Sequence, residues 1–236
     1  MEQGPRYAVF FVPPEQSDLY RFGSAVLGYD CYTGASVEQP FELRHDPVGW
    51  RRATEEPRRY GFHATLKAPF RLSPSCTEQQ LVAAVHSFVG LGYAVPAITP
   101  AVRMLGDFAA VVAAESEPSL ASLAASCTTI FDAYRAPMSP QERARRIAMG
   151  LSQSQIQNLD RWGYPFVLSE FQFHMTLTGK IQEGRRENML AVLQACFRRR
   201  MHGDRQVLVD RIALMKQEST LDSFKVLTHA TPRVEP

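Results

Sequence analysis

The stretch Gly61-Phe62-His63-Ala64-Thr65-Leu66-Lys67 has a near copy later in the chain, Gln172-Phe173-His174-Met175-Thr176-Leu177-Thr178, and both contain Phe-His-x-Thr-Leu. Each copy mixes aromatic, β-branched and polar residues in alternation, which predicts a β-strand. Alternate side chains of a strand share a face, so His63, Thr65 and Lys67 are expected to point one way, and His174, Thr176 and Thr178 to form the matching row. Proton carriers and hydrogen-bond donors opposite an apolar face indicate a functional site.

The recurrence strengthens a signal that either copy alone would carry weakly. A single histidine on a half-buried strand is more often structural than catalytic, but this chain has only six histidines and two of them occupy the same pattern. An internal repeat indicates two related structural units. Two such units facing across a pseudo-two-fold axis would bring His63 and His174 to opposite sides of one cleft.

The paired motifs resemble those of the 2H phosphoesterase superfamily, which includes cyclic nucleotide phosphodiesterases and RNA 2′,5′ ligase-like proteins. The similarity is greatest to a branch associated with phosphonate metabolism and with carbon–phosphorus lyase genes. It extends over nearly the whole chain, at residues 6–11, 21–23, 27–30, 59–70, 162–165 and 171–179.

The order of predicted elements indicates an α+β duplication with mostly antiparallel strands. Capping and turn signals predict helices at 17–27, 77–88, 118–134, from 139, 152–162 and 185–201, and strands at 6–12, 102–105, 108–113, 207–215 and 224–228. The resemblance implies a bilobal 2H fold, with two mostly antiparallel sheets related by a pseudo-two-fold, a central cleft and flanking helices. We expect one bilobal domain over 1–236, with a first repeat at about 1–114, a helical insertion at about 115–165 and a second repeat at about 166–236.

Composition and charge restrict the classes of partner. Hydrophobic residues make up 45% of the 236, and 26 basic against 24 acidic residues give a net charge of +2. Such a balance favours a small phosphorylated substrate over extended nucleic acid. The four cysteines are scattered, which indicates neither a zinc site nor a disulfide framework. With no secretory signal pattern and no membrane span in the sequence, we expect a cytoplasmic protein without a metal or cofactor.

Two opposed histidines suit the hydrolysis of a phosphodiester without a metal ion. One imidazole can act as the base for the attacking oxygen and the other as the acid for the leaving oxygen, and the assignment of these roles stays open. Thr65 and Thr176 can donate to the phosphoryl oxygens, so these threonines and both histidines are the catalytic candidates. Lys67, Thr178 and Tyr7 are the substrate-binding candidates.

Three functions remain open. The first is a phosphoesterase for a small cyclic phosphate or phosphodiester, and the association with phosphonate catabolism adds a phosphorylated ribose cyclic phosphate as a substrate. The second is an RNA-end 2′,3′-cyclic phosphodiesterase or a 2′,5′ ligase-like activity. The third is a non-catalytic module that binds a phosphorylated metabolite. The arginine-rich segment 39–59, expected to be a mobile connection with at most one helical turn, is either a lid or a solvated surface, and the oligomeric state is undetermined.

Overall fold

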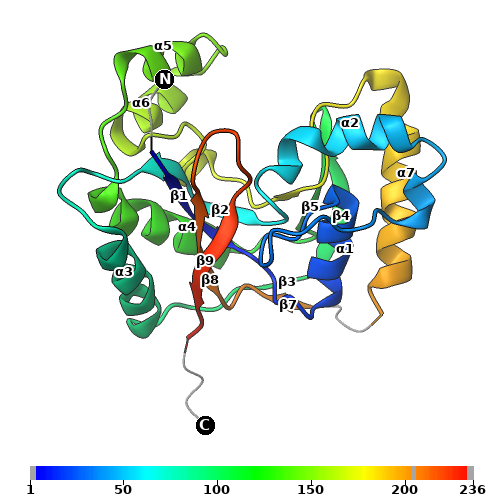
Figure 1. Cartoon of the computed structure of the whole chain (residues 1–236), viewed down its shortest axis with the longest axis horizontal. Coiled ribbons are helices and arrows are strands. Elements are labelled where there is room, and N and C mark those ends of the chain that lie inside the picture. Colours follow the sequence, from blue (N-terminus) through cyan, green and yellow to red (C-terminus); the bar gives the residue numbers. More distant parts are fainter. Residues whose placement is uncertain (1–3, 203–205, 233–236) are drawn as a thin grey trace.

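The computed structural model describes residues 4–202 and 206–232 and shows an α+β protein built on a seven-stranded antiparallel sheet (Figure 1). The strand order is β4-β5-β6-β2-β1-β8-β9. The strands are β1 (Arg6–Phe11), β2 (Ala64–Arg71), β4 (Pro100–Leu105), β5 (Phe108–Ala113), β6 (Met175–Thr176), β8 (Ile212–Gln217) and β9 (Lys225–Ala230). A small separate ribbon pairs β3 (Ala97–Ile98) with β7 (Val207–Leu208).

The helices cover the sheet in two groups at opposite ends of the molecule (Figure 1). In one group α3 packs against β8 and β9, α4 packs against β2, and α5 packs against α6; in the other, α1 contacts α2 and α7, and α7 packs on β4. The α-helices are α1 (Asp18–Leu27), α2 (Pro47–Arg58), α3 (Glu78–Gly90), α4 (Pro118–Phe131), α5 (Pro140–Ile147), α6 (Gln153–Trp162) and α7 (Glu183–Arg200). Short 3-10 turns lie at Phe41–Leu43, Asp132–Tyr134 and Leu168–Glu170. Of the helices in the described ranges, none combines the length and hydropathy needed to cross a membrane.

Several predicted helix ends are confirmed by their capping geometry. Ser17 caps α1 and Gly28 ends it in the left-handed conformation, while Thr77 forms a complete capping box at the start of α3. The predicted turn after residue 105 is the β4–β5 hairpin. The strand predicted at 207–215 is two elements instead, the short β7 and the longer β8.

The two predicted sheets are one continuous sheet, because the two histidine motifs pair with each other. Ala64 of β2 lies opposite Met175 of β6, and this pair joins the two sides of the sheet. The second motif forms a strand of only two residues, shorter than the predicted 172–178. The backbone N–H groups of Leu177 and Thr178 both donate to the carbonyl oxygen of Ala109, which ends the regular ladder there.

The prediction of a mobile connection over 39–59 is wrong, since most of this segment is α2. Asp46 caps the helix by accepting a hydrogen bond from the N–H of Gly49 at 2.9 Å. Pro47 occupies the first turn, where a missing N–H costs nothing. The segment 39–59 was predicted as a connection because it contains three prolines and is polar, although the helix has a normal start signal.

Pro57 explains how α2 is fixed beside the sheet. Because proline has no N–H, the carbonyl of Ala53 one turn earlier loses its helical partner. That oxygen accepts instead from the N–H of Gly179, at 2.7 Å, just beyond the second histidine motif. This hydrogen bond holds the end of α2 against the sheet, where Glu56 and Pro57 line the same cleft as the two motif histidines.

Candidate active site

The four catalytic candidates, His63, Thr65, His174 and Thr176, line one cleft of about 600 Å³. We call it the histidine cleft. It opens where β2 and β6 meet, with the end of α2 on one side and Arg146, Met149 and Tyr164 from the α5–α6 region also in its wall. The four residues that were predicted to form one site therefore lie together, and their catalytic role stays a prediction.

Both imidazoles are held in the same way by the backbone two residues earlier. Nδ1 of His63 lies 2.8 Å from the carbonyl oxygen of Gly61, and Nδ1 of His174 lies 2.8 Å from that of Gln172. A carbonyl oxygen can only accept, so each Nδ1 carries the proton and each Nε2 is left as an acceptor. At His63 the hydroxyl of Thr65 lies 3.3 Å from Nε2. Each ring thus presents a nitrogen that can take up a proton.

A phenylalanine from the neighbouring strand supports each imidazole. Phe10 of β1 stacks on His63, with ring centroids 3.7 Å apart and planes 19° apart. Phe108 of β5 contacts His174, with centroids 5.7 Å apart. Both rings also line the cleft. Neither residue was among the site candidates predicted from the sequence, because neither belongs to a histidine motif.

Burial keeps both histidines neutral near pH 7. The pKa of His63 is lowered to about 4, chiefly by loss of hydration, while the bond to Gly61 opposes this effect and the nearby His174 adds a smaller lowering. Burial also lowers the pKa of His174 below its usual value. A neutral imidazole is ready to act as a base, whereas the partner that acts as an acid must first gain a proton.

Gly61 sets the approach of the chain to His63. Its φ is +74°, and a Cβ at this position would lie 2.5 Å from Cβ of Cys31. Glycine is the residue that accommodates both the left-handed backbone and this close packing. The carbonyl group that orients the imidazole of His63 therefore belongs to a residue at which a larger side chain would not fit.

Thr176 and Thr178, the two threonines of the second histidine motif, differ in how their hydroxyls are used. Thr176 lines the cleft, and among the described residues its hydroxyl forms no hydrogen bond, so it is available to a ligand there. Thr178 also borders the cleft, but its side chain is fully buried and accepts a hydrogen bond from the N–H of Ala109 at 2.9 Å. Thr178 is thus part of the framework of the β5–β6 junction.

The expectation that Lys67 faces the cleft is wrong, and a β-bulge is the reason. Along β1 and β2, Phe10 pairs with Thr65 but Val9 pairs with Lys67, so Leu66 is an extra residue in β2. One extra residue turns the side chains that follow to the opposite face. Simple alternation from His63 therefore fails after Thr65.

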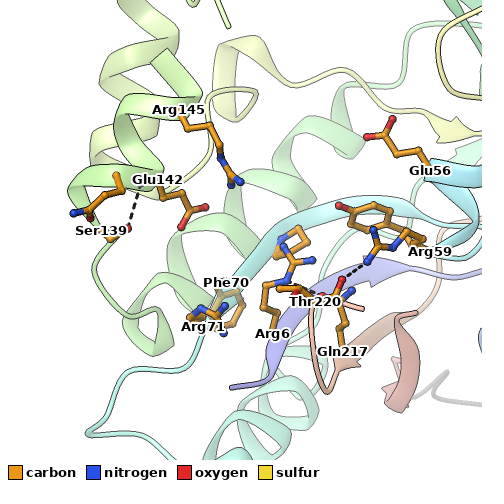
Figure 2. Close-up of a pocket in the computed structure, with 13 residues that line it drawn as sticks. Arg6, Glu56, Arg59, Phe70, Arg71, Ser139, Glu142, Arg145, Gln217 and Thr220 are labelled. Atoms are coloured by element: carbon orange, nitrogen blue, oxygen red, sulfur yellow. Dashed lines mark hydrogen bonds between the residues drawn. The ribbon is translucent and has the colours of Figure 1, made fainter. Parts of the chain in front are cut away.

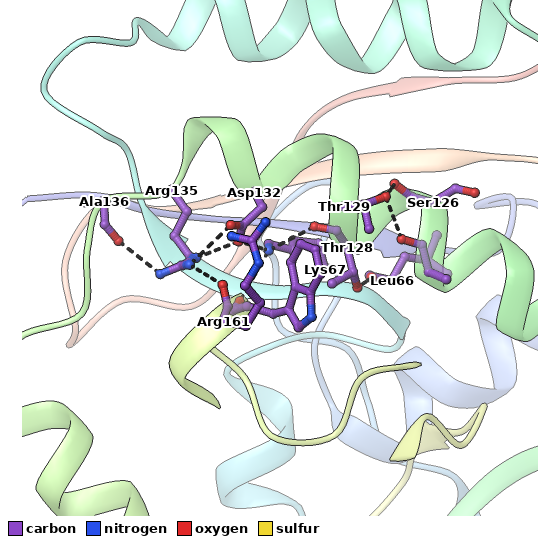
Figure 3. A network of polar contacts seen from close by, with 11 residues as sticks. Leu66, Lys67, Ser126, Thr128, Thr129, Asp132, Arg135, Ala136 and Arg161 are labelled. Carbon is purple, nitrogen blue, oxygen red and sulfur yellow. Dashed lines mark hydrogen bonds and ion pairs between the residues drawn. The ribbon is translucent and has the colours of Figure 1, made fainter. Parts of the chain in front are cut away.

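The ammonium group of Lys67 lies in a buried polar network on the far side of β2 (Figure 3). The residue is 2% exposed, and its ammonium group donates to Oδ1 of Asp132 at 2.7 Å and to the carbonyl oxygens of Thr128 and Trp162. Arg135 also donates to Asp132, at 2.7 Å. Burial lowers the pKa of Lys67, an effect that Asp132 opposes. This lysine ties β2 to α4 and α6.

Tyr7, the third substrate-binding candidate, also lies away from the histidine cleft. It is 3% exposed, and its hydroxyl donates to Oε2 of Glu78 at 2.7 Å. Burial and the carboxylate of Glu78 raise its pKa to about 12, so it holds its proton at neutral pH. Tyr7 fastens α3 to β1, because it points to the opposite face of the strand from Phe10.

A second cavity of about 770 Å³ adjoins the histidine cleft, and Figure 2 shows its lining. The two share Arg6, Glu56, Tyr60 and Pro69 in their walls, so they lie side by side. Of the five arginines in 39–59, Arg59 lines this second cavity. Within 39–59, the end of α2 is thus the part that borders the two cavities and the only candidate for a lid among the described residues.

Within residues 4–202 and 206–232, no group of three or more histidine, cysteine or acidic side chains is arranged to hold a metal ion. The four cysteines are free thiols, and three of them are buried.

The chain belongs to the family described as "Protein of unknown function (DUF1045)", whose model matches residues 65–225. Two curated relatives are each 34% identical to it. Both are named "Ribose 1,5-bisphosphate phosphokinase PhnN": the one from Janthinobacterium sp. (strain Marseille) aligns over 82% of this chain and 43% of its own length, and the one from Laribacter hongkongensis (strain HLHK9) over 75% and 41%. The chain thus spans less than half the length of the curated relatives it matches.

One similar solved structure is titled "Crystal Structure of the Conserved Protein of Unknown Function ATU0111 from Agrobacterium tumefaciens str. C58". It is 12% identical, and the alignment covers 97% of this chain and 86% of that one with a TM-score of 0.45. A likeness of this degree supports no functional argument.

Proposed function

We propose that this chain is a metal-independent phosphoesterase of the 2H type that hydrolyses a small cyclic phosphate or phosphodiester by paired histidine acid–base catalysis. The observation that carries the proposal is the convergence in one cleft of two histidines that directly precede the paired strands β2 and β6, each with Nδ1 bound to a backbone carbonyl. This leaves two Nε2 atoms to exchange protons with a ligand between them.

The pseudo-two-fold of the 2H fold is part of the proposal. In the strand order β2 and β6 are adjacent, β1 and β5 flank them, and each flanking strand supplies the phenylalanine beside a histidine. This correspondence supports β1–β2 and β5–β6 as equivalent units. It supports β5 as part of the second repeat, so it favours a boundary between the repeats at the Gly106–Asp107 turn over one near residue 114. Because α4 packs on β2, it also favours α5 and α6 as the inserted helices within 115–165.

We assign the base to His63 and the acid to His174. Burial lowers the pKa of His63 to about 4, which keeps it ready to accept a proton from water. The oxygen of that water forms a new bond to phosphorus, and the bond from phosphorus to the leaving oxygen breaks. His174, protonated as the phosphate anion binds, gives its proton to the leaving oxygen. A cyclic phosphate so becomes a phosphomonoester and a free hydroxyl, and exchange with solvent resets both rings.

Thr65 and Thr176 stabilise the charge on the non-bridging oxygens. Stabilisation of this charge is a large part of phosphoryl-transfer catalysis. The hydroxyl of Thr65 lies 3.3 Å from Nε2 of His63, so its rotation toward a bound phosphoryl group also frees that nitrogen for water. Thr176 needs no such exchange, because its hydroxyl lines the cleft and forms no hydrogen bond within the described residues.

The names of the two curated relatives support a phosphorylated ribose as the substrate class. Both names denote a kinase of ribose 1,5-bisphosphate, a ribose with two phosphates. The chain corresponds to less than half of either protein, so the kinase activity is not transferred to it. Together with the resemblance to the phosphonate-associated branch, the names favour a phosphorylated ribose cyclic phosphate.

The test is turnover in EDTA against ribose 1,2-cyclic phosphate 5-phosphate, nucleoside 2′,3′-cyclic phosphates and a 2′,5′-linked dinucleotide. Wild type is compared with His63→Ala and His174→Ala, and His45→Ala at an exposed position is the matched control. We expect activity to survive EDTA and to fall about 100-fold or more in both cleft variants, with the control unchanged.

Preference for a nucleotide substrate would replace the ribose assignment with RNA-end processing. Activity that disappears with EDTA, or that is indifferent to both substitutions, would overturn the mechanism. A wild-type protein that turns over nothing but binds a phosphorylated ligand would be a binding module.

A further inference from the structure

The cavity beside the histidine cleft is rich in arginine. Arg6 reaches it from β1, Arg59 from the end of α2, and Arg145 from α5 on the opposite side (Figure 2). These segments are far apart in the sequence, so the clustering is a product of the fold. We call this cavity the arginine pocket.

Neutral groups, not carboxylates, position two of these arginines. Nε of Arg6 donates to Oε1 of Gln217 at 2.7 Å, and its guanidinium lies over the ring of Phe224, 5.5 Å from the centroid. Arg59 donates to the backbone carbonyl of Thr220. Among the described residues neither guanidinium forms an ion pair, so the positive charges are fixed in place without being neutralised.

The third arginine, Arg145, has no hydrogen bond or ion pair within the described residues, and Figure 2 shows it extending into the pocket. The nearest acidic group on its own helix, Glu142, is paired with Arg146 at 2.7 Å. Glu56 stands on the wall shared with the histidine cleft and forms no ion pair in the described ranges. Within the described part of the chain, three guanidinium groups without an ion pair thus share the pocket with one unpaired carboxylate, Glu56, while the lining carboxylate of Glu142 is already paired with Arg146.

We propose that the arginine pocket binds a terminal phosphomonoester of the substrate whose second phosphate reacts in the histidine cleft; the proposal rests on the proposed function for that second step. Guanidinium groups match phosphate oxygens in pairs of charge-assisted hydrogen bonds, and a phosphomonoester carries nearly two charges at neutral pH. A cyclic phosphate or diester carries one. The more positive compartment therefore takes the more charged end.

The two cavities are neighbours, so one ligand with two phosphates can occupy both. Arg6 borders both cavities and is held by Gln217, which lines the arginine pocket. A terminal phosphate held on the arginine side fixes the direction in which the substrate lies across the histidines. Binding energy from this remote group then orients the reacting phosphate for in-line attack.

The first experiment measures binding without turnover, by calorimetry with ribose 5-phosphate as the probe. We expect saturable binding that Arg145→Ala and Arg59→Ala each weaken about 10-fold or more. Arg52→Ala, which removes an exposed charge from α2 outside both cavities, should leave binding unchanged. His63→Ala should also bind the probe normally. Absence of saturable binding, or equal weakening by Arg52→Ala, would overturn the proposal.

The second experiment compares kcat/KM for a ribose 1,2-cyclic phosphate with and without a 5-phosphate. Arg145→Ala should lower kcat/KM about 10-fold or more for the phosphorylated substrate and leave the other unaffected. An equal loss on both would refute the terminal-phosphate site. If no cyclic phosphate is hydrolysed but ribose 5-phosphate binding depends on Arg145, the proposed function fails while the arginine pocket stands.

Discussion

The carbonyl oxygen of Gly61 accepts a hydrogen bond from Nδ1 of His63 at 2.8 Å, two residues along the chain. The same contact joins Gln172 to His174. Since the backbone fixes both tautomers, the cleft needs no carboxylate to orient its imidazoles. Activity should therefore be sensitive to the backbone before each histidine.

Gly61→Ala should destabilise the protein by about 2–5 kcal/mol, since it adds left-handed backbone strain to a collision with Cys31. Gly106→Ala is the matched control: its φ is +61°, but a Cβ there meets open space. It should cost only about 1–2 kcal/mol. Urea unfolding measures both, and equal losses would show that packing against Cys31 is unimportant.

The pH dependence of kcat/KM follows from the two lowered pKa values. His63 as base must be neutral, so activity should rise with pH through about 4. His174 as acid must be protonated, so activity should fall as pH rises through a value below the usual 6.5. The maximum of kcat/KM thus lies in the acidic range. In the profile of kcat, the bound phosphate should shift the falling limb to higher pH. A rising limb at or above pH 7 would contradict this assignment.

The two threonines of the second motif should separate catalysis from stability. Thr176→Val removes a hydroxyl that lines the cleft and should lower kcat about 100-fold with little change in unfolding free energy. Thr178→Val leaves the buried N–H of Ala109 without its acceptor and should cost about 1–3 kcal/mol while kcat changes little. Steady-state kinetics and urea unfolding on both variants test this, and the reverse pattern would exchange their roles.

Lys67→Met should act on stability and not on substrate binding. Removal of the ammonium group leaves Asp132 with Arg135 as its remaining cationic partner, and we expect a loss of about 2–4 kcal/mol. KM should stay within about twofold of wild type, because the side chain lies outside both cavities. A large rise in KM with unchanged stability would restore Lys67 as a substrate ligand.

The parts of the fold that could be predicted rest on local signals. Ser17 and Gly28 bracket α1, and the repeated motif identifies the four residues that meet in the histidine cleft. Local chemistry sets a helix cap, and a repeat carries its own evidence of a shared structural role.

The missed features depend on contacts between distant segments. The bulge at Leu66, which turns Lys67 away, is a register shift between β1 and β2 that alternation within one strand cannot reveal. The docking of Ala53 on Gly179 and the gathering of Arg6 with Arg145 likewise appear only in three dimensions. A start signal for α2 was present at Asp46-Pro47, but the prolines nearby obscured it.

The most direct test of paired acid–base catalysis compares leaving groups in EDTA. A nitrophenyl phosphodiester releases an anion that needs no proton, whereas the alkoxide of a cyclic ribose phosphate does. His174→Ala should lose about 100-fold or more on the cyclic phosphate and retain most activity on the nitrophenyl ester, and His63→Ala should lose activity on both. Equal retention by both variants, or loss of all wild-type turnover in EDTA, would contradict the account.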